Sequence, residues 1–143
     1  SVERHPGRAE ALRATCARMG VRSVRVDVAD AGAPRADGPF DRVLADPPCS
    51  GLGTLQARPD LRWRMTPERI EGLIAEQRRI LAAAVAAVRP GGVVVWSTCT
   101  LDPAENEGLL AGIDRATIID TQTLMPHETR SAGFQIIRLR VDG

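Results

Sequence analysis

Two cysteines, each following an apolar run typical of a buried strand, are the residues of this sequence best suited to chemistry. Cys49 lies in the run 46–51 (DPPCSG), and Cys99 lies in the run 97–100 (STCT). An α/β protein places its chemistry at the carboxyl ends of its parallel strands. Because a thiolate is a strong nucleophile, two thiols delivered to that edge predict covalent catalysis.

The residues beside Cys49 suit the presentation of a side chain at a strand end. Pro47 and Pro48 lack an N–H group, so they end the pairing of the strand and stiffen the turn. Gly51 then allows the backbone to approach a ligand closely. Cys16 stands in a helical segment without any motif, and we expect it to be an inert core residue.

The chain alternates between strand-like and helix-like segments, which predicts a doubly wound α/β sheet. Thr66, Pro67 and Glu68 supply the N-cap, first position and first-turn acid of a long helix. Expected strands are 1–3, 21–28, 40–45, 93–96, 117–119 and 133–141; expected helices are 6–19, 67–88 and 103–112; expected loops are 29–39 and 51–64.

Composition excludes several classes of protein. The 143 residues are 43% hydrophobic with a net charge of +1, which fits one globular domain or part of one without a strong basic field. No apolar run approaches the roughly 20 residues that span a bilayer, so we expect a cytoplasmic protein without membrane contact. Three cysteines without a C-x-x-C pair, and two histidines, predict neither a disulfide framework nor a metal site.

Several motifs in the same order resemble those of the RNA cytosine-C5 methyltransferases of the Sun/Fmu type, in particular the branch that modifies bacterial small-subunit ribosomal RNA. The likeness runs from about Ser1 to Val141, and its specificity comes from the co-linearity of the motifs. The residues that carry it are 40–53 (FDRVLADPPCSGLG), 58–60 (RPD), Trp63, Gln77, 89–92 (RPGG), 97–100 (STCT), Pro103 and 105–107 (ENE).

This resemblance implies methyl transfer from S-adenosylmethionine to C5 of a cytosine in ribosomal RNA. Cys99 would attack C6 of the ring, which makes C5 nucleophilic, and Cys49 would assist elimination and product release. Asp46 would bond N3 of the cytosine and protonate it. Taken alone, an aspartate such as Asp46 is often a turn former, but burial that raises its pKa would suit the catalytic role. The cytosine must come from a loop or be extruded.

The same resemblance implies three acids at the cofactor. Glu3 matches the acid that binds the ribose hydroxyls, and Asp27, with Asp30 as a neighbour, matches the acid near the adenine. Asp46 borders the cofactor as well as the base. Arg58, a loop residue, is a candidate for contact with the RNA backbone, as are its neighbours Asp60 and Arg62.

The family's first strand and its glycine-rich cofactor motif are expected upstream of Ser1. We therefore predict a Rossmann-like sheet that is incomplete at its N-terminal side, with residues 1–143 as a partial catalytic domain that has little activity alone. In this fold the first strand lies between the strands at 1–3 and 40–45, so the sheet should be interrupted there.

Two alternatives stay open. The run 46–48 (DPP) also begins the motif of methyltransferases that act on exocyclic amino groups, although Cys49 stands where those enzymes carry an aromatic residue and cannot stack on a base. A domain that has lost catalysis and binds RNA or a protein is the other alternative.

Overall fold

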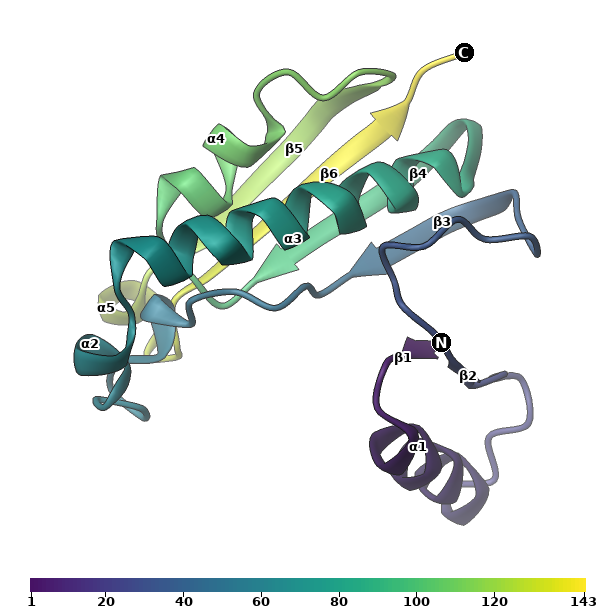
Figure 1. Ribbon diagram of the computed structural model, residues 1–143, viewed down its shortest axis with the longest axis horizontal. Coiled ribbons are helices and arrows are strands. Elements are labelled where there is room, and N and C mark those ends of the chain that lie inside the picture. Colours follow the sequence, from purple (N-terminus) through teal and green to yellow (C-terminus); the bar gives the residue numbers. More distant parts are fainter.

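The computed structural model describes all residues from 1 to 143, which form strands and helices in alternation (Figure 1). The strands are β1 (Val2–Glu3), β2 (Asp27–Val28), β3 (Phe40–Ala45), β4 (Val88–Thr98), β5 (Ala116–Leu124) and β6 (Phe134–Val141). The α-helices are α1 (Pro6–Arg18), α2 (Leu61–Arg64), α3 (Pro67–Ala86), α4 (Glu107–Leu110) and α5 (Pro126–Thr129), and the 3-10 helices are η1 (Leu52–Thr54) and η2 (Pro103–Glu105).

The strands form two separate sheets. β1 pairs with β2 in parallel, and a second sheet has the order β3-β4-β6-β5. In that sheet β3 and β4 run parallel, whereas β6 is antiparallel to both of its neighbours. No hydrogen bonds link β1 to β3, so the interruption expected between the segments 1–3 and 40–45 is confirmed, as is the mixed α/β class.

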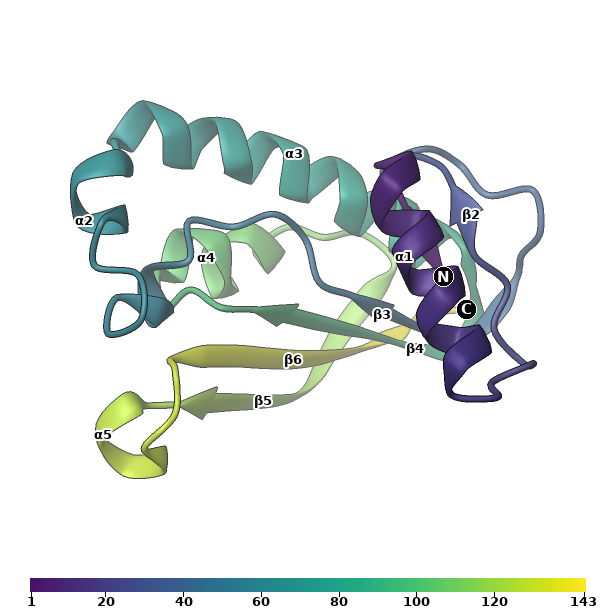
Figure 2. The same ribbon diagram turned by 90° about the horizontal axis from the view of Figure 1, so that it is seen from below.

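The hydrophobic core lies between the larger sheet and the helices α3 and α4, which cover one of its faces (Figure 2). Apolar residues at helical spacing on α3 meet alternate residues of the strands. Trp96 on β4 and Ile137 on β6 are fully buried at its centre. None of the helices combines the length and apolar character that crossing a membrane requires.

The N-terminal unit of α1, β1 and β2 is tied to the rest of the molecule through charged groups on α3. Arg4 pairs with Glu76 at 2.8 Å, and Asp30 pairs with Arg79 at 2.8 Å. Both pairs are accessible to solvent, which screens them, so each adds little to stability.

The long helix begins where the sequence predicts. The hydroxyl of Thr66 accepts a hydrogen bond from the N–H of Arg69, as an N-cap does. The helix ends at Ala86, and β4 already begins at Val88 rather than at Val93. The segment 89–92 forms an irregularity inside β4, because the register with β3 shifts between Phe40 and Arg42.

Other predicted boundaries are wrong. The strand expected at 21–28 is reduced to Asp27–Val28, because β1 offers only two residues to pair with. The helix expected at 103–112 is a 3-10 helix followed by a single α-helical turn, and the strand expected at 117–119 is the nine-residue β5. Cys16 is half-buried on α1 and lies outside the hydrophobic core, so its assignment as a core residue is also wrong.

Candidate active site

The structure brings the two motif cysteines together. Cys99 follows the last residue of β4, and Cys49 lies four residues beyond the end of β3. Because these strands are parallel neighbours, both residues lie at the carboxyl edge of the sheet. Their sulfur atoms are 3.4 Å apart, and both side chains are half-buried.

This contact gives the two thiols opposite acidities. A hydrogen bond from Cys49 to the sulfur of Cys99 lowers the pKa of Cys99 to about 7, although burial opposes the shift. The positive charge of Arg58 adds to the lowering, whereas the charge of Asp46 acts against it. The same hydrogen bond, together with burial, raises the pKa of Cys49 well above the usual thiol range. Near neutral pH, Cys99 is therefore the available thiolate and Cys49 is the proton donor.

Asp46 lies at the end of β3, beside the thiol pair. No hydrogen bond or ion pair from the protein engages its carboxyl group, in contrast to Asp27, Asp30 and Asp37. Partial burial raises the pKa of Asp46 above its ordinary value. A carboxyl group with free oxygens and a raised pKa is suited to donate a proton to a bound ligand.

The backbone beyond Cys49 contacts the Cys99 loop directly. The N–H of Gly53 donates to the carbonyl oxygen of Cys99 at 3.0 Å, and the N–H of Gly133 donates to the carbonyl oxygen of Gly53 at 2.7 Å. A β-carbon at position 53 would lie 2.2 Å from the oxygen of Gly133. Only glycine therefore permits the close approach of these three segments.

A group of buried polar side chains lies beneath the thiols, and the sequence analysis assigned it no role. Its members make hydrogen bonds to the residues on either side of each cysteine. The sequence signal for this group is a polar residue among apolar ones, such as Gln77 on the buried face of α3. The members are Ser50, Gln77, Thr98, Thr100, Glu105 and Asn106.

Glu3 lies at the end of β1, as expected for a ribose-binding acid. Its Oε1 atom accepts a hydrogen bond from the N–H of His5 at 2.8 Å and pairs with Arg8 at 3.0 Å. The hydrogen bond from His5 is the main cause that lowers the pKa of Glu3. Its Oε2 atom has no hydrogen-bond partner in the protein and is free to accept one.

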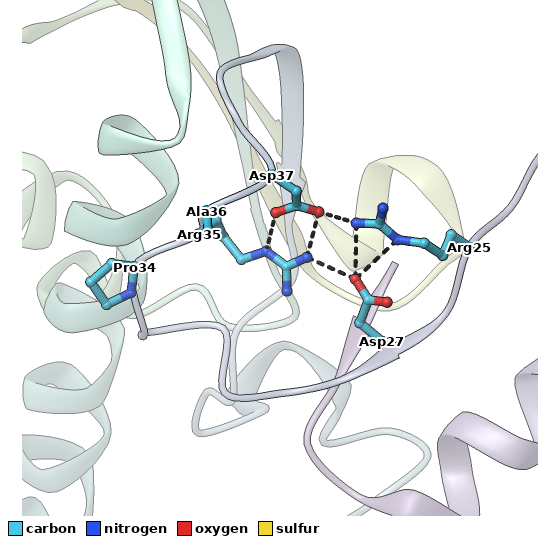
Figure 3. A pocket seen from close by; sticks show the side chains of 6 residues that line it. All are labelled: Arg25, Asp27, Pro34, Arg35, Ala36 and Asp37. Carbon is cyan, nitrogen blue, oxygen red and sulfur yellow. Dashed lines mark hydrogen bonds and ion pairs between the residues drawn. The ribbon is translucent and has the colours of Figure 1, made fainter.

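Asp27 belongs to a cluster of four charged side chains, drawn in Figure 3. Its Oδ2 atom binds Arg35 at 2.7 Å and Arg25 at 3.1 Å, and both arginines also bind Asp37. The hydrogen bond from Arg35 is the largest cause that lowers the pKa of Asp27, and it lowers the pKa of Asp37 to about 2.

The cluster lines an open hollow of about 450 Å³ next to β2. The Oδ1 atom of Asp27 has no hydrogen-bond partner in the protein. Asp30, its neighbour, is instead bound by Arg79 through both of its oxygens. Of the two acids, Asp27 therefore keeps an acceptor for a ligand. Glu3 and Asp27 lie together on the β1–β2 sheet, which is not hydrogen-bonded to β3, the strand that ends just before Asp46.

Helix α2 lies beyond the carboxyl ends of β3 and β4 (Figure 1), and it carries an exposed aromatic residue. Leu61 anchors this short helix, because it is 2% exposed and packs against Gly51. Trp63 on the same helix is 82% exposed. Arg62, also exposed, has no ion-pair partner, whereas Arg64 pairs with Asp60 at 3.0 Å.

The sheet and its flanking helices define a fragment of the fold of S-adenosylmethionine-dependent methyltransferases. The model of the family described as 16S rRNA methyltransferase RsmB/F matches residues 1–136. The chain belongs to this family, which confirms the resemblance inferred from the motifs.

Individual relatives agree with this assignment. The chain is 36% identical to the probable ribosomal RNA small subunit methyltransferase B of Synechocystis sp., over 96% of this chain and 36% of that protein. It is 36% identical to the ribosomal RNA small subunit methyltransferase F of Serratia proteamaculans, over 83% of this chain and 25% of that protein. It thus spans about a third or less of the length of these relatives.

A solved structure with a similar fold is that of NSun6 from Pyrococcus horikoshii with SFG, an analogue of S-adenosylmethionine. It aligns with a TM-score of 0.90 and 30% identity, over 99% of this chain and 41% of that one. The similarity covers both sheets of the present chain, including the N-terminal unit.

Proposed function

We propose that the protein transfers a methyl group from S-adenosylmethionine to C5 of a cytosine in ribosomal RNA, with Cys99 as the covalent catalyst. The observation that carries the proposal is the thiol pair, in which Cys99 has a pKa of about 7 and Cys49 donates to its sulfur. Membership of the RsmB/F family supports ribosomal RNA as the substrate class. With ribosomal RNA as the substrate, we propose the cytoplasm as the location of the activity.

The first step forms a bond between the sulfur of Cys99 and C6 of the cytosine. An aromatic ring is a poor carbon nucleophile, and the sulfur bond moves electron density toward C5. Asp46 bonds N3 and gives it a proton as negative charge develops there. Its raised pKa and its lack of protein partners support this role.

In the last step a water molecule takes the proton from C5, and N3 returns its proton to Asp46. The electron pair of the broken C5–H bond restores the C5–C6 double bond, and the pair of the C6–S bond returns to Cys99 as that bond breaks. Cys49 assists this elimination, because its thiol stabilises the departing sulfur as a thiolate. The 3.4 Å separation of the sulfurs supports this assignment.

S-adenosylmethionine, when bound, would supply the electrophilic methyl group to C5 and leave as S-adenosylhomocysteine. Glu3 would bind the ribose hydroxyls with its free Oε2 atom, and Asp27 would bind near the adenine with its free Oδ1 atom. Asp46 borders the same site from the end of β3. These free acceptors are the features of the chain that fit the cofactor.

The surface around α2 is suited to bind single-stranded RNA or an extruded base. An exposed indole ring offers a face on which a base can stack, and arginines offer contacts to phosphates. Trp63 and Arg62 provide these groups on one helix, and Arg58 lies close enough to act on Cys99.

The test is methylation of an unmodified small-subunit ribosomal RNA transcript by the full-length protein, followed by mass spectrometry of the nucleosides. The proposal expects 5-methylcytidine, absent with the Cys99→Ala variant and present with Cys16→Ala. A product methylated on the exocyclic amino group, formed equally by Cys99→Ala, would favour the alternative chemistry. RNA binding without any methylation would favour a domain that has lost catalysis.

A further inference from the structure

The residues that directly follow the two cysteines are bonded to each other. The hydroxyl groups of Ser50 and Thr100 are 2.9 Å apart, and both side chains are buried. The loops that carry Cys49 and Cys99 are therefore joined one residue beyond each thiol, although 50 residues of chain separate them.

Glu105 holds the Cys49 side of this junction. It is fully buried, and it accepts the N–H of Ser50 at 2.9 Å and the hydroxyl of Ser50 at 2.5 Å. It has no cationic partner, so N–H and O–H donors alone satisfy it. Because a carboxylate only accepts, the hydroxyl proton of Ser50 is used at Glu105, and Thr100 must donate to Ser50.

Gln77 binds the residue on the other side of Cys49, Pro48. Its Nε2 atom donates to the carbonyl oxygen of Pro48 and to Glu105, each at 2.9 Å. These two bonds fix the orientation of the amide and leave its Oε1 atom buried without a partner. A buried acceptor without a partner costs free energy. Pro48 and Ser50 are thus both held, with Cys49 between them.

Asn106 holds the Cys99 loop in the same manner. Its Oδ1 atom accepts the hydroxyl of Thr98 at 2.7 Å, and its Nδ2 atom donates to the carbonyl oxygen of Thr100 at 3.1 Å. A second donation, to the carbonyl oxygen of Asp102 at 2.9 Å, completes its bonding. Thr98 and Thr100 are the residues on either side of Cys99.

We propose that the adjacent residues Glu105 and Asn106 are positioning residues that set the separation between the sulfur of the nucleophile and that of its partner thiol. Glu105 holds the loop of Cys49, Asn106 holds the loop of Cys99, and the peptide bond between them fixes one loop relative to the other. The proposal rests on the proposed function for its kinetic effect. Its effect on the thiols themselves does not depend on which reaction they catalyse.

The test compares Glu105→Gln with Glu107→Gln in the full-length protein. Glu107 is an exposed carboxylate two residues away that accepts a hydrogen bond from Gln135 instead, so it is a matched control. The amide group that Glu105→Gln introduces can keep an oxygen for the N–H of Ser50 and for Nε2 of Gln77, but it sets an N–H group against the hydroxyl of Ser50. The short bond from that hydroxyl is lost, which loosens the hold on the Cys49 loop. The readouts are the pH dependence of Cys99 alkylation by iodoacetamide, mapped by mass spectrometry, and the kcat and KM of methylation.

The direction of the pKa change separates positioning from simple electrostatics. Removal of a nearby negative charge would by itself lower the pKa of a thiol. Displacement of Cys49 would weaken its hydrogen bond to Cys99 and raise the pKa of Cys99 from about 7 toward the ordinary 9.0. We expect an upward shift of the alkylation midpoint and a fall in kcat of about 10- to 100-fold with KM for RNA unchanged, since small misplacements of reacting groups have effects of this size.

Ser50→Ala is the second variant, and it tests the positioning role if Glu105→Gln does not fold. It removes the hydroxyl that joins the loops and keeps the N–H that Glu105 accepts, so a smaller upward shift is expected. A folded Glu105→Gln protein with an unchanged or lowered midpoint would overturn the proposal, and so would an unchanged midpoint in Ser50→Ala if only that variant folds. Upward shifts without any C5 methylation by the wild-type protein would leave the positioning role standing and refute the proposed function.

Discussion

The sulfur of Cys49 lies 3.4 Å from the sulfur of Cys99, and this contact divides the roles of the two residues. In a hydrogen bond between two thiols, one thiol is the donor. Cys49 is the donor here, because, beyond the hydrogen bond itself, burial raises its pKa, whereas the charge of Arg58 helps to lower the pKa of Cys99. Cys99 is left as the more acidic thiol, which is the state that a nucleophile requires. The sequence motifs alone do not reveal this asymmetry.

The pH dependence of Cys99 reactivity tests the contact. Because the pKa of Cys99 is lowered to about 7, its alkylation rate should rise through that pH and level off above it. Cys49→Ala removes the hydrogen-bond donor and should move the midpoint toward the ordinary value of 9.0. Cys49→Ser keeps an O–H donor and should stay near the wild-type midpoint. Equal midpoints in Cys49→Ala and the wild type would show that the contact does not set the acidity.

The proton donated to N3 can be tested with Asp46→Asn. The amide keeps the shape of the side chain but has no acidic proton to give, so kcat should fall by about 10²- to 10⁴-fold with RNA binding retained. The wild-type rate should decline as pH rises through the raised pKa of Asp46, and this dependence should vanish in the variant. Asp41→Asn, an exposed change on β3, the strand that precedes Asp46, serves as the control; equal rates in the two variants would exclude the role.

The close approach at Gly53 is tested by substitution with alanine. The added β-carbon would lie 2.2 Å from the carbonyl oxygen of Gly133 and 2.9 Å from that of Cys99. Gly53→Ala should therefore destabilise the protein by about 1–3 kcal/mol in denaturant unfolding. Gly72→Ala, on α3 with no atom within 4 Å, should be neutral or stabilise by about 0.5–1 kcal/mol. A Gly53→Ala protein as stable as wild type would contradict the packing described.

The stacking role of Trp63 is tested by RNA binding at fixed salt. Loss of one stacked base costs about 1–3 kcal/mol, so Trp63→Ala should weaken binding of single-stranded RNA by about 5- to 150-fold. Thermal stability should not change, because the ring is 82% exposed. Trp63→Phe keeps an aromatic face and should bind better than the alanine variant. Met19→Ala, another exposed apolar residue, is the control, and equal affinity in all four proteins would remove Trp63 from the binding surface.

The proximity of the two thiols can be predicted from the sequence, because it follows from residue patterns that are local in the chain. Two apolar runs that each end in a cysteine motif define parallel strands, and neighbouring parallel strands end at one edge. The same patterns locate α3, whose capping residues stand beside each other in the chain. They overestimate the strand at 21–28, since strand length depends on the partner that is available for pairing.

The buried polar group beneath the thiols could not be predicted in this way. The hydrogen bonds of Ser50 and Gln77 join residues 28 to 55 positions apart, such as Ser50 with Glu105 and Gln77 with Glu105. Only tertiary packing reveals such partners. The ion pairs of Asp27 with Arg25 and Arg35 are equally invisible in the sequence, because mixed charges in a loop are usually solvated.

The central claim is that Cys99 bonds covalently to a cytosine. The most direct measurement is denaturing electrophoresis and mass spectrometry of the full-length protein incubated with S-adenosylmethionine and small-subunit ribosomal RNA transcribed with 5-fluorocytidine. Fluorine at C5 blocks the elimination, so the account predicts a stable protein–RNA adduct through Cys99, lost in Cys99→Ala. It also predicts that Cys49→Ala accumulates an adduct on ordinary RNA. Methylation that survives in Cys99→Ala, or an adduct through another residue, would contradict the account.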